Sequence, residues 1–213
     1  MTNPYYPIFL KVKGERCVVV GGGDVAERKV RTLLGCGALP VVVSPSLSSG
    51  LRSLADQGMV KVVEREYEAG VLEGSRLVIA ATDDTAVNAR VVAEAGERGI
   101  LVNVVDSAEL SDFILPSLVQ RGDLTVAIST AGRSPALARK LRTVLEHGLG
   151  QEYGELALLL SEVRGELKRR GRKVEGDTWQ EYLDLEMLLR RLKQGEREMV
   201  KKELVASLAG ETG

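Results

Sequence analysis

The sequence predicts an α/β protein whose N-terminal part is a doubly wound parallel sheet of the Rossmann type. Short β-branched runs alternate with amphipathic helical stretches over residues 11 to about 110, which is the pattern of parallel strands joined by crossover helices. A run of glycines follows the first β-branched stretch and opens the first helical one, as a nucleotide-binding sheet requires. From changes in texture we expect three parts, a nucleotide-binding domain (1–111), a small α/β dimerisation or substrate region (112–150) and a helical region (151–213).

The predicted strands of the first domain are continuous apolar runs, which suit a sheet that is covered on both faces. They are residues 17–20, 41–43, 60–63, 77–81 and 101–105. The intervening stretches carry apolar residues at three- and four-residue spacing and are predicted to be crossover helices. These are residues 25–34, 47–55 and 87–95.

Beyond the first domain, a strand is predicted at residues 124–129 and a helix that begins at Ser134-Pro135. Serine is a preferred N-cap because it accepts a free backbone N–H, and proline at the first helical position has no N–H to leave unpaired. After residue 150 we expect two charged helices. A capping-box pattern at Thr178 to Glu181 is predicted to open the second of them.

Bulk properties exclude several classes of protein. With 29 basic and 30 acidic side chains, the chain lacks the positive surplus of a nucleic-acid binder. It has neither a leader pattern nor an apolar run near the ~18 residues that span a membrane, so we expect a soluble, cytoplasmic protein without a membrane partner. Cys17 and Cys36 lie in apolar sequence and are expected to be buried, reduced thiols. No resident metal site is predicted.

The glycine run matches the dinucleotide-binding pattern GxGxxA. Gly21 permits a tight turn, Gly23 allows phosphate to approach the backbone, and Ala26 keeps helix and strand close. The phosphates would meet the free N–H groups at the start of the helix, where Asp24 and Val25 lie. We therefore predict that Gly21, Gly23, Asp24 and Val25 bind the cofactor.

The acidic residue that usually holds the adenosine ribose at the end of the second strand is absent. The chain reads Ser44-Pro45-Ser46 at that point. Ribose binding is therefore assigned to the Ser44 or Ser46 hydroxyl or to backbone groups. The absence of an arginine just after the strand favours NAD over NADP.

Polar residues also follow the fourth and fifth predicted strands, at the edge where open α/β sheets place their ligands. The candidates are Thr82, Asp83, Asn103 and Asp106, with Val104 beside them. The alternative role of such residues is N-capping and turn formation, which fits Asp84 and Ser107 better.

Five motifs in order make the chain closely resemble the precorrin-2 dehydrogenase family, which includes the N-terminal half of multifunctional siroheme synthase. They are VGGGDVAERK (20–29), AATDD (80–84) with Asn88, NVVD (103–106), FILPS (113–117) and ISTAGRSPALAR (128–139). The resemblance runs from about residue 7 to about residue 149.

The resemblance implies that the chain oxidises precorrin-2 to sirohydrochlorin with NAD as cofactor, in siroheme or another branch of tetrapyrrole biosynthesis, as a homodimer. Fe²⁺ would be a substrate if the chain also shares the chelatase activity of some members. Asp106 matches the family's essential aspartate, and an acid-base role is predicted for it, the alternative being that it only orients cofactor or substrate. Thr130, Arg133 and Ser134 are predicted to contact the anionic substrate.

Two further expectations concern partners and alternatives. The 63 residues after Gly150 are too few for the methyltransferase domain of the multifunctional enzyme, so a separate methyltransferase is expected to supply precorrin-2. The alternative function is a non-catalytic module that senses NAD(H). Such a module would need the glycine turn but has no use for the motifs at 113–117 and 129–139.

Overall fold

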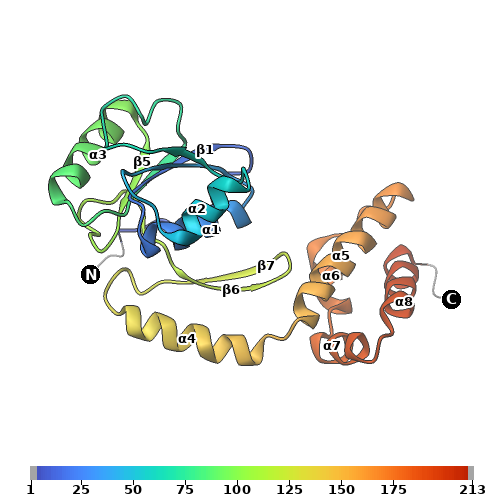
Figure 1. Cartoon of the computed structure of the whole chain (residues 1–213). Helices are drawn as coiled ribbons and strands as arrows, with labels where there is room; N and C mark the ends of the chain where they lie inside the picture. Colours follow the sequence, from blue (N-terminus) through green and yellow to red (C-terminus); the bar gives the residue numbers. More distant parts are fainter. Residues whose placement is uncertain (1–3, 211–213) are drawn as a thin grey trace. The chain divides into compact units, whose positions relative to one another are not determined.

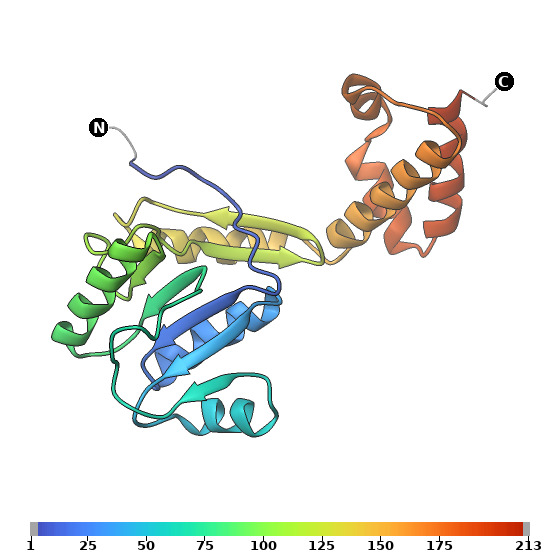
Figure 2. The same ribbon diagram turned by 90° about the horizontal axis from the view of Figure 1, so that it is seen from above.

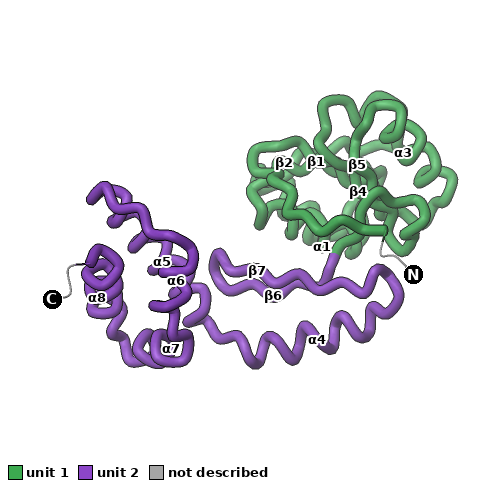
Figure 3. The backbone as a smooth tube through the Cα atoms, turned by 180° about the vertical axis from the view of Figure 1, so that it is seen from behind, with its two compact units in different colours: residues 1–115 green, residues 116–213 purple. Residues whose placement is uncertain are grey.

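The computed structural model describes residues 4–210, which form two compact units (Figure 3). The first unit ends at Leu115 and the second begins at Pro116. This boundary lies four residues after the one expected at residue 111. The further division expected at residue 150 falls inside the second unit and stays a prediction.

The first unit is built on a parallel five-stranded sheet with the order β3-β2-β1-β4-β5 (Figures 1 and 2). All five predicted strands are present: β1 (Arg16–Val20), β2 (Leu39–Val43), β3 (Lys61–Val63), β4 (Leu77–Ala80) and β5 (Leu101–Val104). Val18 of β1 pairs with Val41 on one side and Val78 on the other. Because the chain moves outward from β1 to β3 and then returns to β4, the topological switch point lies between β1 and β4.

Helices cover both faces of this sheet, as the unbroken apolar strands predict. The three predicted crossovers are α1 (Asp24–Gly35), α2 (Ser49–Asp56) and α3 (Thr85–Arg98). Val30 of α1 and Leu51 of α2 pack with Val19 on one face, and Val91 of α3 packs with Val18 on the other. A buried aliphatic side chain contributes about 1.5–3 kcal/mol, so these two layers stabilise the unit.

The connection from β3 to β4 contains no α-helix, and a buried glutamate of α3 holds it against the sheet. Glu94 is only 6% exposed. Its carboxylate accepts hydrogen bonds from the Tyr67 hydroxyl at 2.5 Å and the Gly70 N–H at 3.0 Å, and it pairs with Arg98 at 2.9 Å. Burial acts to raise the pKa of Glu94, but hydrogen bonds from Tyr67, Gly70 and Leu72 outweigh it and hold the pKa below its ordinary value.

The second unit begins with an antiparallel hairpin, β6 (Ser117–Arg121) and β7 (Leu124–Ile128), followed by α4 (Pro135–Gly148). The Ser134 side chain accepts the Leu137 N–H at 3.2 Å, which confirms the predicted N-cap. Arg121 ties the hairpin to the C-terminal end of α4, because its guanidinium donates to the Leu149 and Glu146 carbonyls at 2.7 and 2.9 Å.

Four further helices complete this unit: α5 (Glu152–Arg169), α6 (Gly176–Tyr182), α7 (Leu185–Lys193) and α8 (Arg197–Ala209). They share an apolar core that includes Leu159, Leu188 and Leu204. The capping box predicted at Thr178 is wrong, because Thr178 lies inside α6 and a separate cap, Asp184, opens α7. No helix within residues 4–210 combines the length and apolar character that a membrane span needs.

The two cysteines differ in environment. Cys17 is buried in β1, and burial raises the pKa of its thiol to about 11. Cys36 is exposed at the C-cap of α1, so the expectation that it is buried is wrong. The apolar neighbours that suggested burial, Leu33 and Leu34, belong to the last turn of the helix, whereas Cys36 is its C-cap.

Replacing Glu94 by Gln should destabilise the first unit by about 1–3 kcal/mol at neutral pH, since buried hydrogen bonds to a charged group are lost. A depressed folded-state pKa gives stability that is present above the unfolded pKa of about 4.3 and lost as the pH falls through the folded value. The difference from wild type should therefore shrink below about pH 4.

Native-state hydrogen exchange of the β1 and β4 amides measures this difference. Glu97→Gln, which removes an exposed carboxylate from the same helix, controls for net charge. A difference that stayed constant from pH 7 to pH 3 would contradict the role assigned to the buried carboxylate.

Candidate functional site

The turn after β1 packs tightly against both neighbouring strand ends. Gly21 has a φ of 123°, and a β-carbon there would overlap the Ala81 carbonyl oxygen at the end of β4. A β-carbon on Gly22 would overlap the carbonyl oxygen of Ser46, in the loop after β2. Gly23 differs, because a β-carbon there would meet no atom within 4 Å. The turn therefore has one open side, at Gly23.

The helix that follows the turn has a free N-terminus. Among the described residues, no side chain caps α1, whereas Ser48 caps α2 and Asp84 caps α3. The first N–H groups of α1, beginning at Asp24 and Val25, therefore lack side-chain acceptors. Together with the open space at Gly23, this arrangement fits the pyrophosphate of a dinucleotide, which takes backbone N–H donors and the positive end of a helix dipole.

The loop after β2 offers fewer hydroxyls than the sequence suggests. Ser44 is only 7% exposed, and its hydroxyl donates to the Ser46 carbonyl at 2.7 Å. Pro45 and Ser46 are exposed. Of the two predicted ribose ligands, Ser46 therefore has the accessible side chain, while Ser44 shapes the loop.

At the end of β4, Asp84 has the capping role that the sequence predicts, accepting the Ala86 and Val87 N–H groups at 2.8 and 3.1 Å. Thr82 accepts the Asp84 N–H at 2.8 Å, and Asp83 is exposed.

Asn88 of α3 stabilises the turn after β4, since its side-chain N–H donates to the Thr82 carbonyl at 3.0 Å. Its buried Oδ1 has no hydrogen-bond partner among residues 4–210.

At the end of β5, Asp106 is exposed and has a φ of 60°, a left-handed conformation that aspartate tolerates better than most residues. Ser111 holds this turn closed, because its hydroxyl lies 2.9 Å from the Val104 N–H and 2.6 Å from the Ser107 carbonyl. Asn103 is buried and donates to the Phe113 carbonyl at 2.9 Å. Asn103 and Val104 therefore support the turn, and Asp106 is the exposed carboxylate that it presents.

Sequence reasoning missed Lys29 of α1, which is half-buried. Burial and the charge of Arg28 lower the pKa of Lys29, and the nearby charge of Asp106 raises it. A fixed positive charge therefore lies within electrostatic reach of the candidate carboxylate. Helical spacing could have revealed it, because Lys29 follows Val25 by four residues and so shares a side of α1 with the phosphate-binding turn.

In the second unit, the turn from β7 to α4 contains the predicted substrate residues. Thr130 accepts the Ser134 N–H at 3.0 Å, and Ala131 and Gly132 both have positive φ. Arg133 is exposed at the tip of this turn.

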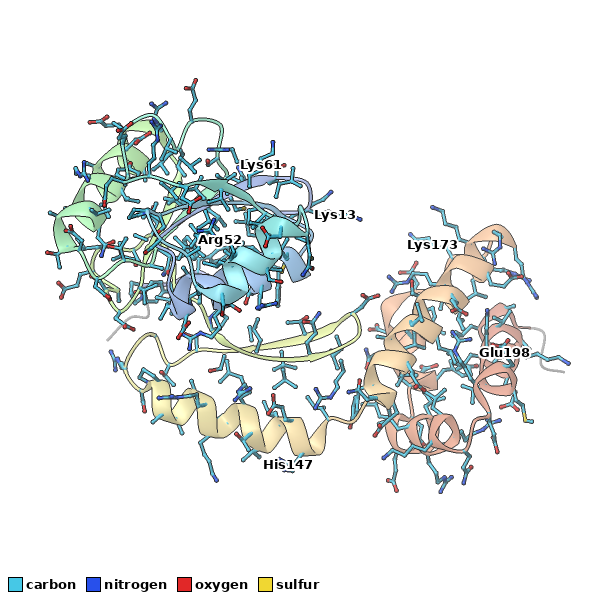
Figure 4. The ribbon with its side chains drawn as sticks, in the orientation of Figure 1. Lys13, Arg52, Lys61, His147, Lys173 and Glu198 are labelled. Atoms are coloured by element: carbon cyan, nitrogen blue, oxygen red, sulfur yellow. The ribbon has the colours of Figure 1, made fainter. Side chains whose placement is uncertain are left out.

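The single histidine, His147, lies in the last turn of α4 with Nδ1 2.6 Å from the Thr143 carbonyl oxygen (Figure 4). No group of three or more potential metal ligands was found among residues 4–210.

Within the first unit, the predicted residues follow the carboxyl ends of four adjacent strands. In sheet order these ends belong to β2, β1, β4 and β5, and the residues are Ser44–Ser46, Gly21–Gly23, Thr82–Asp83 and Asp106. Three strand spacings cover about 14 Å, which suits an extended dinucleotide lying along the edge. Fold and site together define a dinucleotide-binding α/β protein.

Comparison with known proteins shows which family within this class the chain resembles. Residues 8–117 match a family described as "Putative NAD(P)-binding", and residues 121–147 match "Sirohaem biosynthesis protein central". Siroheme synthase of Chromobacterium violaceum is 46% identical over 166 residues, which is 78% of this chain and 35% of that protein. Siroheme synthase of Nitrosococcus oceani is 39% identical over 97% of this chain and 44% of its own length.

A solved structure titled "SirC, precorrin-2 dehydrogenase" matches with a TM-score of 0.71 and 26% identity, covering 97% of this chain and all of that one. The chain therefore belongs to the family of precorrin-2 dehydrogenases and siroheme synthase N-terminal domains. It spans less than half the length of the siroheme synthases it matches.

Two neighbouring glycines make a matched test of the turn. Gly23→Ala should cost less than about 1 kcal/mol of stability, because its β-carbon enters open space, yet should weaken ADP-ribose binding about tenfold by blocking phosphate approach. Gly22→Ala should instead cost about 1–3 kcal/mol through overpacking against Ser46.

Thermal unfolding and titration calorimetry on the full chain separate the two effects. Equal affinity of the wild type and Gly23→Ala for ADP-ribose would contradict the phosphate site at Gly23.

Proposed function

We propose that the chain is an NAD-dependent precorrin-2 dehydrogenase, which oxidises precorrin-2 to sirohydrochlorin. The observation that carries this proposal is the sheet edge that combines an open phosphate-binding turn with the exposed carboxylate of Asp106. The similarity over nearly the whole chain to a structure titled precorrin-2 dehydrogenase supports it. An NAD(H)-sensing module would need the turn but has no use for Asp106.

The chain's residues would hold NAD in two places. Gly21, Gly23, Asp24 and Val25 would hold the pyrophosphate through backbone N–H groups. Ser46 and the backbone of its loop would hold the adenosine ribose, and no arginine stands there to favour a 2′-phosphate. Bound NAD⁺ supplies the hydride acceptor of the reaction.

Asp106 is proposed as the base that takes the proton released when precorrin-2 loses a hydride. Its carboxylate is exposed, and the Ser111 bonds hold its turn in place without an induced rearrangement. General-base catalysis contributes ~10²–10⁴-fold when the base is well positioned. Lys29 of α1 adds a positive charge near this carboxylate.

Thr130, Arg133 and Ser134 are proposed to contact carboxylates of the substrate, because arginine and helix N-termini both bind carboxylate groups. Arg121 is less suited, since backbone carbonyls of its own unit already accept its guanidinium N–H groups.

Insertion of Fe²⁺ into sirohydrochlorin is a second candidate reaction, favoured by the similarity to siroheme synthases. In that reaction Fe²⁺ is a substrate, and Asp106 would take the protons that leave the pyrrole nitrogens. Supply of precorrin-2 by a separate methyltransferase and a cytoplasmic location stay predictions.

We further propose that two copies associate through the second unit. Leu137, Leu141 and Val144 are exposed at four- and three-residue spacing on α4, and Leu118 is exposed on β6. Spacing of this kind places the three α4 side chains on one side of the helix. An exposed apolar stripe on a helix indicates a protein interface.

Asp106→Asn should lower the rate of precorrin-2 oxidation by ~10²–10⁴-fold while NAD⁺ binding stays near the wild-type value, because asparagine keeps the left-handed turn but cannot act as a base. Anaerobic absorbance follows NADH and sirohydrochlorin, and subsequent Fe²⁺ addition tests chelation in the same cuvette.

Glu109→Gln, an exposed change in the same loop, is the control. Wild-type protein that binds NAD⁺ but never turns over precorrin-2 would overturn the proposal in favour of the sensor.

Leu141→Glu should convert the proposed dimer to monomers, since it places a charge in the apolar stripe. Sedimentation equilibrium measures the change in mass. Leu158→Glu, on α5, is the matched control because Leu141 and Leu158 are similarly exposed, at 41% and 50%. A monomeric wild type, or a dimer that Leu141→Glu leaves intact, would rule out this interface.

A further inference from the structure

A hydrogen bond joins α1 to the loop that follows β2. The Ser48 hydroxyl donates to Glu27 Oε2 at 2.7 Å across 21 residues of sequence. The same hydroxyl accepts the Leu51 N–H at 3.1 Å as the N-cap of α2. The Ser48 N–H donates to the Gly22 carbonyl at 2.7 Å. Ser48 thus connects the glycine turn, the first helix and the start of the second.

Two glycines make room for this connection. A β-carbon on Gly50 would overlap the Glu27 carboxylate, and one on Gly22 would overlap the Ser46 carbonyl oxygen. The Glu27 side chain is only 21% exposed, although glutamates on helices are usually solvated. The phosphate turn and the loop over residues 44–48 therefore pack as one piece, with the carboxylate between them.

The Glu27 carboxylate is held in its charged form. The hydrogen bond from Ser48, followed by the bond from Arg31, keeps the pKa of Glu27 below its ordinary value. Hydrogen bonds to a charged acceptor are roughly twice as strong as neutral ones. Arg31 is the more exposed partner, with about half of its side chain in contact with solvent.

We propose that Glu27 and Ser48 form a clamp that holds the adenosine-side loop, residues 44–48, in the conformation that binds NAD. Glu27 is thus a positioning residue and need not touch the nucleotide. No carboxylate stands at the end of β2 to bind the ribose, because that position is Ser44, so ribose binding depends on the conformation of this loop. A loop that is already ordered binds more tightly because less conformational entropy is lost. This inference rests on the proposed NAD site.

The test measures binding of NAD⁺, ADP-ribose and nicotinamide mononucleotide to the full-length chain by titration calorimetry. Glu27→Ala and Ser48→Ala should each weaken NAD⁺ and ADP-ribose about tenfold and leave the mononucleotide unchanged. Ser48→Thr, which keeps the hydroxyl, should restore binding. Arg31→Ala should stay within about twofold, because an exposed partner contributes little.

Two readouts separate a clamp from a general loss of structure. Hydrogen exchange of the ligand-free chain should rise at residues 44–51 in both alanine variants and stay unchanged in β4 and β5. In a double-mutant cycle, the double variant should bind no more weakly than Ser48→Ala alone, because Ser48→Ala already removes the Glu27–Ser48 hydrogen bond together with the N-cap of α2.

Each outcome decides a separate point. If the wild-type protein binds none of the three ligands, the proposed NAD site itself is contradicted. Wild-type binding that both alanine variants match within twofold would overturn the clamp alone. Additive losses in the double variant, or equal weakening of the mononucleotide, would also overturn it. If Glu27→Ala fails to fold, Glu27→Met decides the question, because it keeps the length of the side chain and the Ser48 cap of α2 but cannot accept the Ser48 hydroxyl.

Discussion

The turn after β1 packs closely against the chain that follows β2 and β4. This packing determines the arrangement of the loops at the nucleotide-binding edge of the sheet. Gly21 abuts the Ala81 carbonyl and Gly22 abuts the Ser46 carbonyl, so neither position has space for a side chain. This packing fixes where α1 begins and leaves its first N–H groups open at Gly23. The loops after β2 and β4 take their positions against the same turn, and the candidate site therefore depends on these contacts.

Polar side chains near this edge divide into those that build it and those that a ligand can reach. The side chains of Ser44, Asn103 and Asp84 are hydrogen-bonded to backbone groups of the protein. Asp106 and Ser46 are exposed at the ends of their strands. The first group therefore supports the loops, and the second remains accessible to a ligand.

Several elements of the fold could be predicted because their signals are local. Each strand of the first unit is a short, largely apolar run, and the Ser134-Pro135 start of α4 needs only adjacent residues. The strand β6 was missed because its sequence, SLVQR, mixes polar and apolar residues as an exposed hairpin strand does. The false capping box at Thr178 arose because the same four-residue pattern also fits the interior of a short helix.

The sequence by itself determined the fold class and the GxGxxA turn, since strand periodicity and glycine spacing are set by neighbouring residues. It made Asp106 one candidate among several at the strand ends, and only the family resemblance placed that carboxylate first. Apart from the predicted caps Asp84 and Ser134, tertiary structure decided which polar groups are already bonded. The Glu27–Ser48 bond spans 21 residues, and Ser111 closes the Asp106 turn only because the chain folds back along β5. Such pairings depend on packing between distant segments, which no local pattern specifies.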